Sequence, residues 1–170
     1  MKTYKLNDLN NPLISVLMPA YNAEKYIKEA IESILNQTFS NFEFIIIDDG
    51  SIDATEEIIK SFKDSRIVYI KNEKNLGLIK TLNKGISIAR GEFIARMDSD
   101  DISMPQRFEL QLDVFKKYKG VDIVNVALKK MSEDGTKLSK YRHNIYPGFE
   151  AIHYLINIDT FIVHPGVLVK

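Results

Sequence analysis

The sequence contains no cysteine and no tryptophan. The absence of cysteine excludes disulfide bonds, thiolate metal sites and a cysteine nucleophile. Net charge is also missing, because 23 Lys and Arg residues balance 23 Asp and Glu residues. There is therefore no global field to attract nucleic acid or an anionic membrane. Any recognition of charged ligands must depend on local groups of side chains.

Long apolar runs are absent too. No stretch approaches the roughly 18 apolar residues of a membrane-spanning helix, and residues 1–11 form a polar segment without the apolar run of a signal peptide. We expect that segment to be flexible and the protein to be cytoplasmic. Hydrophobic residues make up 45% and charged residues 27% of the 170-residue chain, which is typical of one globular domain.

Short apolar runs alternate with amphipathic segments along the chain, which is the pattern of an α/β domain. We predict a Rossmann-like, mainly parallel sheet with flanking helices. The expected strands are 14–18, 42–47, 66–70, 92–97, 121–128 and 161–169, with a hairpin whose tip lies at 133–135; the expected helices are 24–37, 53–62, 79–89, 103–119 and 149–155. The first strand should stop at Pro19, because proline cannot donate to a sheet ladder.

Local signals predict where the helices begin and end. Asp53 and Ser103 are the expected N-cap residues of helices 53–62 and 103–119, and Gly91 is expected to terminate the helix before it. The residues expected to face the core from that helix are Ile79, Leu82, Ile86 and Ala89.

Two acidic clusters directly follow two of the predicted strands. One contains Asp48 and Asp49, and the other contains Asp98, Asp100 and Asp101. Ligands of open α/β sheets bind at the carboxyl ends of strands, and gathered carboxylates repel one another unless a cation compensates them. Asp is also common in turns and caps, but the caps here are assigned to other residues. The clusters therefore favour Mg²⁺ or Mn²⁺ that carries a phosphorylated ligand.

Four segments carry a recognisable set of motifs. They are ISVLMPAYN at 14–22, IDDGSID at 47–53, NLG at 75–77 and GEFIARMDSDD at 91–101. In this order and at this spacing they resemble family 2 of the glycosyltransferases, closely up to Gln106 and more loosely beyond. The resemblance implies a GT-A fold of the nucleotide-diphospho-sugar transferase type. It makes residues 1–170 a single domain, with 12–120 as the nucleotide-binding half and 121–170 as the start of the acceptor-side half.

The resemblance also implies roles for individual residues. It assigns nucleotide-sugar binding to Pro19, Ala20, Tyr21, Asp49, Gly77, Lys80, Asp98 and Ser99. Tyr21 would flank the base, and Asp49 would hydrogen-bond it. Asp98-Ser99-Asp100 matches the DXD motif of the family, which makes Asp98 and Asp100 the residues for Mn²⁺ or Mg²⁺, with Asp100 as the direct ligand. Lys80 borders the donor pocket and is equally well explained as an exposed helix residue.

The activity implied is metal-dependent transfer of a sugar, with inversion, from a nucleotide-diphosphate donor to a glycan or lipid-linked acceptor hydroxyl. UDP-sugar is the expected donor. The metal would neutralise the leaving diphosphate, and a carboxylate base would activate the acceptor. We expect that base beyond Lys170, so the chain should be an incomplete domain that binds donor better than it transfers sugar. Family habit places such enzymes in bacterial surface polysaccharide synthesis, at the inner face of the membrane.

Two alternatives stay open. A non-catalytic nucleotide-sugar-binding module would share the donor site and lack the base. A nucleotidyltransferase also joins a nucleotide-binding sheet to metal-binding acids, but it needs a glycine-rich basic loop after the first strand, and residues 19–24 contain no glycine. Among the histidines, His164 is a candidate additional metal ligand, whereas His143 and His153 are expected to lie on the surface or in loops.

Overall fold

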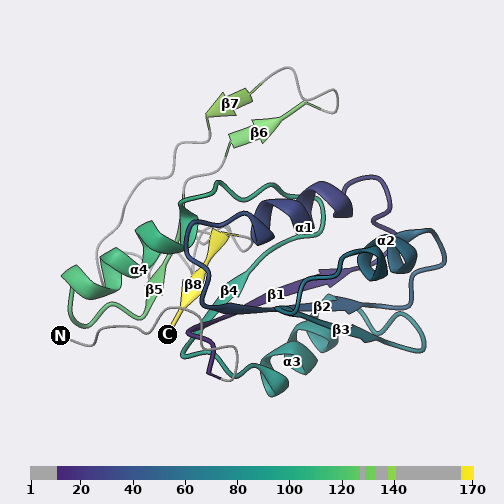
Figure 1. Ribbon diagram of the computed structural model, residues 1–170, viewed down its shortest axis with the longest axis horizontal. Coiled ribbons are helices and arrows are strands. Elements are labelled where there is room, and N and C mark those ends of the chain that lie inside the picture. Colours follow the sequence, from purple (N-terminus) through teal and green to yellow (C-terminus); the bar gives the residue numbers. More distant parts are fainter. Residues whose placement is uncertain (1–10, 127–128, 133–137, 141–165) are drawn as a thin grey trace, which may run out of the picture.

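The computed structural model describes residues 11–126, 129–132, 138–140 and 166–170. Within them, six strands form one sheet in the order β3-β2-β1-β4-β8-β5 (Figure 1). The strands are β1 (Ile14–Ala20), β2 (Phe42–Asp48), β3 (Ile67–Lys71), β4 (Phe93–Arg96), β5 (Ile123–Val124) and β8 (Leu168–Val169). The ladder from β3 to β4 is parallel, and β8 runs antiparallel to both of its neighbours. The expected α/β class with a mainly parallel sheet is confirmed.

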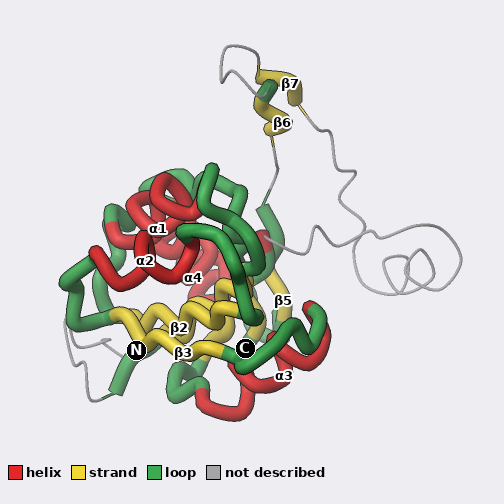
Figure 2. Tube along the Cα trace, turned by 90° about the vertical axis from the view of Figure 1, so that its right-hand side faces the viewer, coloured by secondary structure: helices red, strands yellow, loops and turns green. Residues whose placement is uncertain are grey.

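Helices cover both faces of the sheet. They are α1 (Ile27–Leu35), α2 (Thr55–Ser61), α3 (Leu78–Ile88) and α4 (Arg107–Lys117). The ribbon and the tube, seen from two sides, place α1 and α2 on one side of the sheet and α3 on the other (Figures 1 and 2). A separate hairpin pairs β6 (Lys129–Met131) with β7 (Leu138–Lys140), which confirms the expected hairpin. None of the helices in the described part of the chain is long and apolar enough to span a bilayer.

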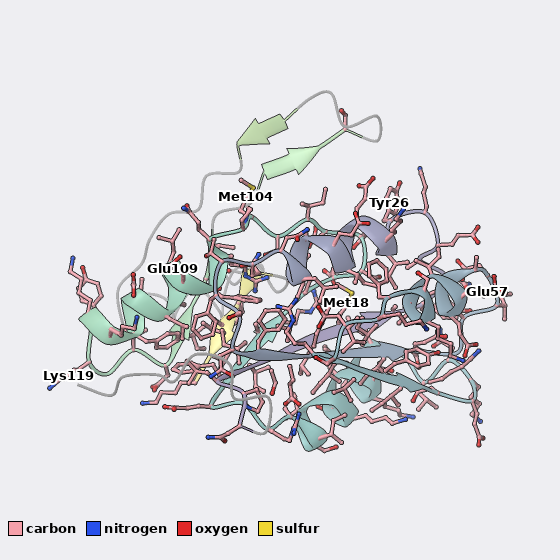
Figure 3. The ribbon with its side chains drawn as sticks, in the orientation of Figure 1. Met18, Tyr26, Glu57, Met104, Glu109 and Lys119 are labelled. Atoms are coloured by element: carbon pink, nitrogen blue, oxygen red, sulfur yellow. The ribbon has the colours of Figure 1, made fainter. Side chains whose placement is uncertain are left out.

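Strands β1 and β2 are mostly apolar because helices cover both of their faces. Every residue of β2 is buried. The larger apolar cluster joins the sheet to α1, α2 and α4, and contains Met18, Ile31, Phe42, Ile59 and Phe108. Figure 3 shows Met18 inside the molecule between α1 and the sheet. A smaller cluster of Leu17, Ile45 and Ile47 lies on the α3 face.

Strand β1 continues through Pro19 to Ala20, so the expected stop at Pro19 is wrong. The carbonyl of Leu17 accepts the amide of Met97, which shows that Leu17 faces the β4 side. Pro19, two residues further on, faces the same side, and β4 already ends at Arg96. Proline is tolerated there because the missing N–H has no strand to pair with.

The two predicted N-caps are also wrong. The N-cap positions of α2 and α4 are Ala54 and Gln106, without side-chain capping bonds. Asp53 instead accepts the amides of Thr55 and Glu24, and Ser103 bonds to the side chain of Gln37. Asp53 thus keeps a local bond to the first residue of α2 and adds a long-range bond to Glu24, whereas the described side-chain partner of Ser103 is the distant Gln37.

The predicted core face of α3 is only partly buried. Ile79 and Ile86 are 76% and 54% exposed, whereas Thr81 and Gly85 pack toward the sheet. Gly91 does not cap the helix, whose C-cap is Ala89. A Cβ atom at Gly91 would lie 2.5 Å from the backbone nitrogen of Ser15, so the glycine allows this segment to approach β1 closely.

The end of the chain is described in part. The strand expected at 121–128 is observed as the two-residue β5, and the strand expected at 161–169 as β8. The hairpin tip at 133–135, the helix at 149–155 and all three histidines lie outside the described residues. The division into halves at residue 120 stays a prediction.

Candidate functional site

The carboxyl ends of β2, β1 and β4 meet at one edge of the sheet. Strand β1 lies between the other two. The chain adds β2 and β3 on one side of β1 and then crosses to add β4 on the other side, so the direction of strand addition reverses at β1. Ligands of open α/β sheets bind at such a switch point. The loops that follow these three strands therefore form the candidate site.

Asp48, at the end of β2, is fully buried. One carboxylate oxygen accepts the backbone amide of Ser51 at 2.8 Å, and the other accepts the hydroxyl of Tyr69 at 3.4 Å. The ammonium of Lys71 lies 4.0 Å away. Asp48 therefore closes the turn after β2 and interacts with β3, although the sequence suggested no structural role for it.

Asp49 fixes the loop that leads into α3. Its Oδ1 accepts the side-chain amide of Asn72 at 2.7 Å and the backbone amide of Leu76 at 2.9 Å, and its Oδ2 accepts the amide of Gly77 at 2.9 Å. Burial acts to raise the pKa of Asp49, but hydrogen bonds from Leu76, Asn72, Thr81 and Gly77 outweigh it and lower the pKa below its usual range. The side chain is therefore an ionised acceptor at the entrance to α3.

Gly50 allows two loops of the site to touch. Its φ is 77°, and a Cβ atom there would lie 2.7 Å from the backbone carbon of Lys74. Both observations exclude a side chain at this position. The turn after β2 thus rests directly on the loop before α3.

Reciprocal hydrogen bonds join the loops after β1 and β2. The amide of Asn22 donates to Ser51 Oγ at 3.0 Å, and Asn22 Oδ1 accepts the amide of Ile52 at 3.1 Å. Asn22 has a φ of 47°, which Asn tolerates better than most residues. This turn leaves Tyr21, the residue before it, 47% exposed at the rim of the site. Sequence reasoning assigned no function to Asn22 or Ser51, and only their loop positions signalled one.

The acidic loop after β4 is combined with buried arginines. Arg96, the last residue of β4, forms an ion pair with Asp98. Burial, followed by the charges of Asp98 and Asp100, raises the pKa of Asp101 to about 6, while Arg96 and Arg107 act in the opposite direction. The carboxylates are therefore close enough to repel one another, and the positive charges only partly compensate them.

This donor set suits a hard divalent cation that completes its coordination with substrate oxygens. Among the residues that the structure describes, no three His, Cys, Asp or Glu side chains are grouped to hold a metal ion by themselves. Mg²⁺ and Mn²⁺ sites commonly use one or two carboxylates plus phosphates. Asp98 and Asp100 thus fit a cation that arrives with a phosphorylated ligand better than a cation that binds alone.

Helix α4 holds the acidic loop after β4 and the segment that leads into β8 together. Arg107 donates to the carbonyl of Arg96 at 2.9 Å and to that of Val167 at 3.2 Å. Gln111 donates to the carbonyls of Val124 and Gly166, both at 2.9 Å. Burial lowers the pKa of Arg107 to about 10, against the opposing effect of Asp101. Neither residue was selected from the sequence, because their strand partners lie far away in the chain.

The remaining predicted site residues lie around this edge. Pro19 and Ala20 pair with Ile47 and Asp48 in the sheet. Gly77 is the N-cap of α3 and contacts Asp49 directly. Ser99 is partly buried in the acidic loop, and Lys80 is exposed on the first turn of α3. The fold brings the predicted residues to one edge, and their roles in binding stay predictions.

Comparison with known proteins identifies the family. The family model described as Glycosyl transferase family 2 matches residues 15–169. The chain belongs to glycosyl transferase family 2. The acidic pairs after β2 and β4 and the NLG loop that Asp49 holds all lie inside the matched segment of this family 2 domain.

Relatives and solved structures agree with this assignment. The family 2 domain is 40% identical to an uncharacterized glycosyltransferase of Methanocaldococcus jannaschii, covering 97% of this chain and 58% of the relative. It is 37% identical to the Escherichia coli UDP-Glc:alpha-D-GlcNAc-diphosphoundecaprenol beta-1,3-glucosyltransferase WfgD, covering 69% of this chain and 49% of that protein. Staphylococcus aureus TarS 1–349, solved in complex with UDP-GlcNAc, matches with a TM-score of 0.63 and 30% identity over 70% of this chain and 34% of TarS. The chain therefore spans about half the length of these curated relatives.

Proposed function

We propose that this family 2 domain binds the donor of a metal-dependent glycosyltransferase, and that the donor is a UDP-sugar. The observation that carries the proposal is the meeting of the Asp48–Asp49 turn and the Asp98–Asp101 loop at the switch point of the sheet. TarS was solved in complex with UDP-GlcNAc, and WfgD is named for UDP-Glc. The same proposal includes transfer of the sugar to an acceptor hydroxyl with inversion of the anomeric centre. It also includes a role in bacterial surface polysaccharide synthesis.

Asp49 and Tyr21 would hold the nucleoside. Asp49 Oδ2 accepts one hydrogen bond from Gly77, and a carboxylate oxygen has room for a second donor. The imide N–H of uracil would supply that donor. Tyr21, exposed beside the turn after β1, would cover a face of the base. Pro19 and Ala20 would line the floor beneath it.

Asp98 and Asp100 would hold Mn²⁺ or Mg²⁺ together with the donor phosphates, with Ser99 between them in the loop. When bound, the cation supplies charge neutralisation for the departing diphosphate. Gly77, at the N-terminus of α3, and Lys80, one turn further on, would border the phosphates and the sugar. The described residues include no assigned general base, so the base that accepts the acceptor proton stays a prediction.

The acceptor is proposed to be a glycan or a lipid-linked glycan. WfgD is named for an acceptor joined to undecaprenol through a diphosphate, and that enzyme covers more than two thirds of this chain. A water-borne donor and a lipid-linked acceptor would meet at a membrane surface, so we place the reaction at the cytoplasmic face by peripheral association.

Calorimetric titration tests the donor site. UDP, GDP and dTDP are each titrated into the chain with and without Mn²⁺. We expect micromolar binding of UDP that requires the metal, weaker binding of GDP, and loss of UDP binding in Asp49→Ala. The control variant is Asp113→Ala, because Asp113 lies on the exposed side of α4 and forms an ion pair with Lys116. Binding that is equal without metal, or that survives in Asp49→Ala, would contradict the proposal.

A further inference from the structure

Arg96 is a buried guanidinium at the edge of the acidic loop. The residue is 8% exposed, and within the described part of the chain neither its Nε nor its Nη1 makes a hydrogen bond. Nη1 forms an ion pair with Asp98, the first acid of the motif. A buried charge is costly unless it is paired. Asp98 therefore compensates the buried charge of Arg96 beside the candidate metal site. The Nε donor of Arg96 has no partner among the described residues.

The charges of this cluster nearly balance before any ligand binds. Asp98, Asp100 and Asp101 contribute three negative charges when ionised, and Arg96 and Arg107 contribute two positive charges, so the formal sum is −1. Three carboxylates alone would attract a divalent cation strongly. Here the guanidinium of Arg96 already contacts Asp98, and a bare cation must share that carboxylate with a neighbouring positive charge.

A nucleoside diphosphate changes this balance, because its phosphates bring negative charge together with the cation. The metal-nucleotide complex is close to neutral or negative, so repulsion by Arg96 no longer opposes its entry. The phosphates also supply the oxygens that the described carboxylates do not provide by themselves. The same guanidinium that disfavours the free metal is compatible with the complex.

We propose that Arg96 is a positioning residue that holds Asp98 and makes metal binding conditional on the diphosphate. This inference rests on the proposed donor site. The arrangement gives the site an order of binding: the cation enters with the nucleotide and not before it. Removing Arg96 should therefore strengthen the binding of Mn²⁺ alone and weaken the coupling between Mn²⁺ and UDP. A residue that only stabilised the fold would change neither quantity.

The test compares Mn²⁺ binding by Arg96→Met and by the wild-type chain. Free Mn²⁺ is measured by electron paramagnetic resonance, first without nucleotide and then with saturating UDP. A unit positive charge beside a metal ligand weakens binding of a divalent cation by on the order of tenfold, even in a water-like dielectric. Arg96→Met should bind Mn²⁺ alone about tenfold more tightly than wild type, and the enhancement by UDP should fall by a similar factor.

Three further variants keep the test decisive. Arg90→Met is the matched control, because Arg90 precedes β4 and pairs with Glu43, and its side chain is half exposed; it should leave both affinities unchanged. Arg96→Gln also removes the charge, and it replaces the methionine variant, with the same expected result, if that variant does not fold, as judged by circular dichroism. Arg96→Lys retains the charge. It should keep Mn²⁺ binding weak in the absence of UDP.

The outcomes separate this inference from the proposed function. Metal-alone affinity in Arg96→Met within twofold of wild type would overturn the inference, as would a tenfold gain in Arg96→Lys. The metal-alone comparison needs no nucleotide, so it remains informative if UDP fails to bind. Failure of UDP binding to the wild-type chain would instead contradict the donor site.

Discussion

Replacing Asp49 with alanine should release the loop before α3 from the sheet. The carboxylate accepts hydrogen bonds from Asn72 at 2.7 Å and from the amides of Leu76 and Gly77 at 2.9 Å. A hydrogen bond to a charged group contributes about 1.5–3 kcal/mol. Water can replace the carboxylate more easily at Leu76, a residue that is 37% exposed, whereas Asn72 is only 3% exposed and would lose a buried partner. We therefore expect a loss of about 2–4 kcal/mol rather than the full sum of three bonds.

Urea denaturation followed by circular dichroism measures this loss. Asp49→Asn keeps the shape and one acceptor oxygen, and should lose about half as much free energy as Asp49→Ala. The exposed control Asp113→Ala should change the free energy of unfolding by less than about 0.5 kcal/mol. Hydrogen exchange of Leu76 and Gly77 should accelerate in Asp49→Ala alone. A loss below about 0.5 kcal/mol in Asp49→Ala would refute the reasoning, because it would mean that the loop holds itself without the carboxylate.

The same carboxylate predicts an acid-sensitive contribution. The pKa of Asp49 in the folded chain lies below its ordinary value of 3.8, so folding favours the ionised form. Its stabilisation is complete above that ordinary value and is lost as pH falls through the lowered pKa. The difference in unfolding free energy between the wild-type chain and Asp49→Asn should therefore shrink on acidification. A difference that is constant or grows toward low pH would contradict this assignment.

Three further outcomes follow from other parts of the structure. Gly91→Ala should destabilise the fold by about 2 kcal/mol or more in urea titrations, because a Cβ atom there would lie 2.5 Å from the backbone of Ser15; an unchanged midpoint would contradict the close approach. Gln111→Leu should leave the buried carbonyl of Gly166 and the partly buried carbonyl of Val124 without their donor and cost about 2–4 kcal/mol. Hydrogen exchange in β8 should become faster, and unchanged exchange would show that β8 docks without Gln111. Carboxyl NMR should find that Asp101 titrates with a pKa of about 6 instead of 3.8. The contribution of Asp101 to the free energy of unfolding should therefore fall as pH rises between those values. Asp101→Asn should abolish that pH dependence.

Elements with strong local patterns were predictable from the sequence. Apart from Glu43 and Asp48, the run Phe42–Asp48 is apolar, because β2 is buried on both faces, as strands of parallel sheets are. The acidic turns after β2 and β4 were also predictable as one edge of the sheet, since parallel strands align their carboxyl ends. These inferences needed only periodicity and the general rule for open α/β sheets.

Features that depend on distant partners were not predictable. Ser103 has the spacing of an N-cap, yet the side chain of Gln37, in the loop after α1, donates a hydrogen bond to it. The apolar residues of α3 fit a core face, yet the sheet accommodates the small side of the helix at Thr81 and Gly85. The pairing of Arg96 with Asp98 is local in the chain, but it depends on where β4 ends, and the sequence did not fix that end. The resemblance identified candidate ligands, but it did not identify the groups that hold them.

Paramagnetic broadening by Mn²⁺ tests the central claim most directly. Amide signals of the chain are recorded with UDP, first with Mg²⁺ and then with traces of Mn²⁺. Broadening should centre on residues 98–101 and extend to the turns at 20–22 and 48–51. It should spare Phe42, which lies six residues before Asp48 in β2, roughly 20 Å away along the strand. Broadening centred elsewhere, or broadening of the 98–101 loop that is unaffected in Asp100→Ala, would contradict a metal-nucleotide site at this edge of the sheet.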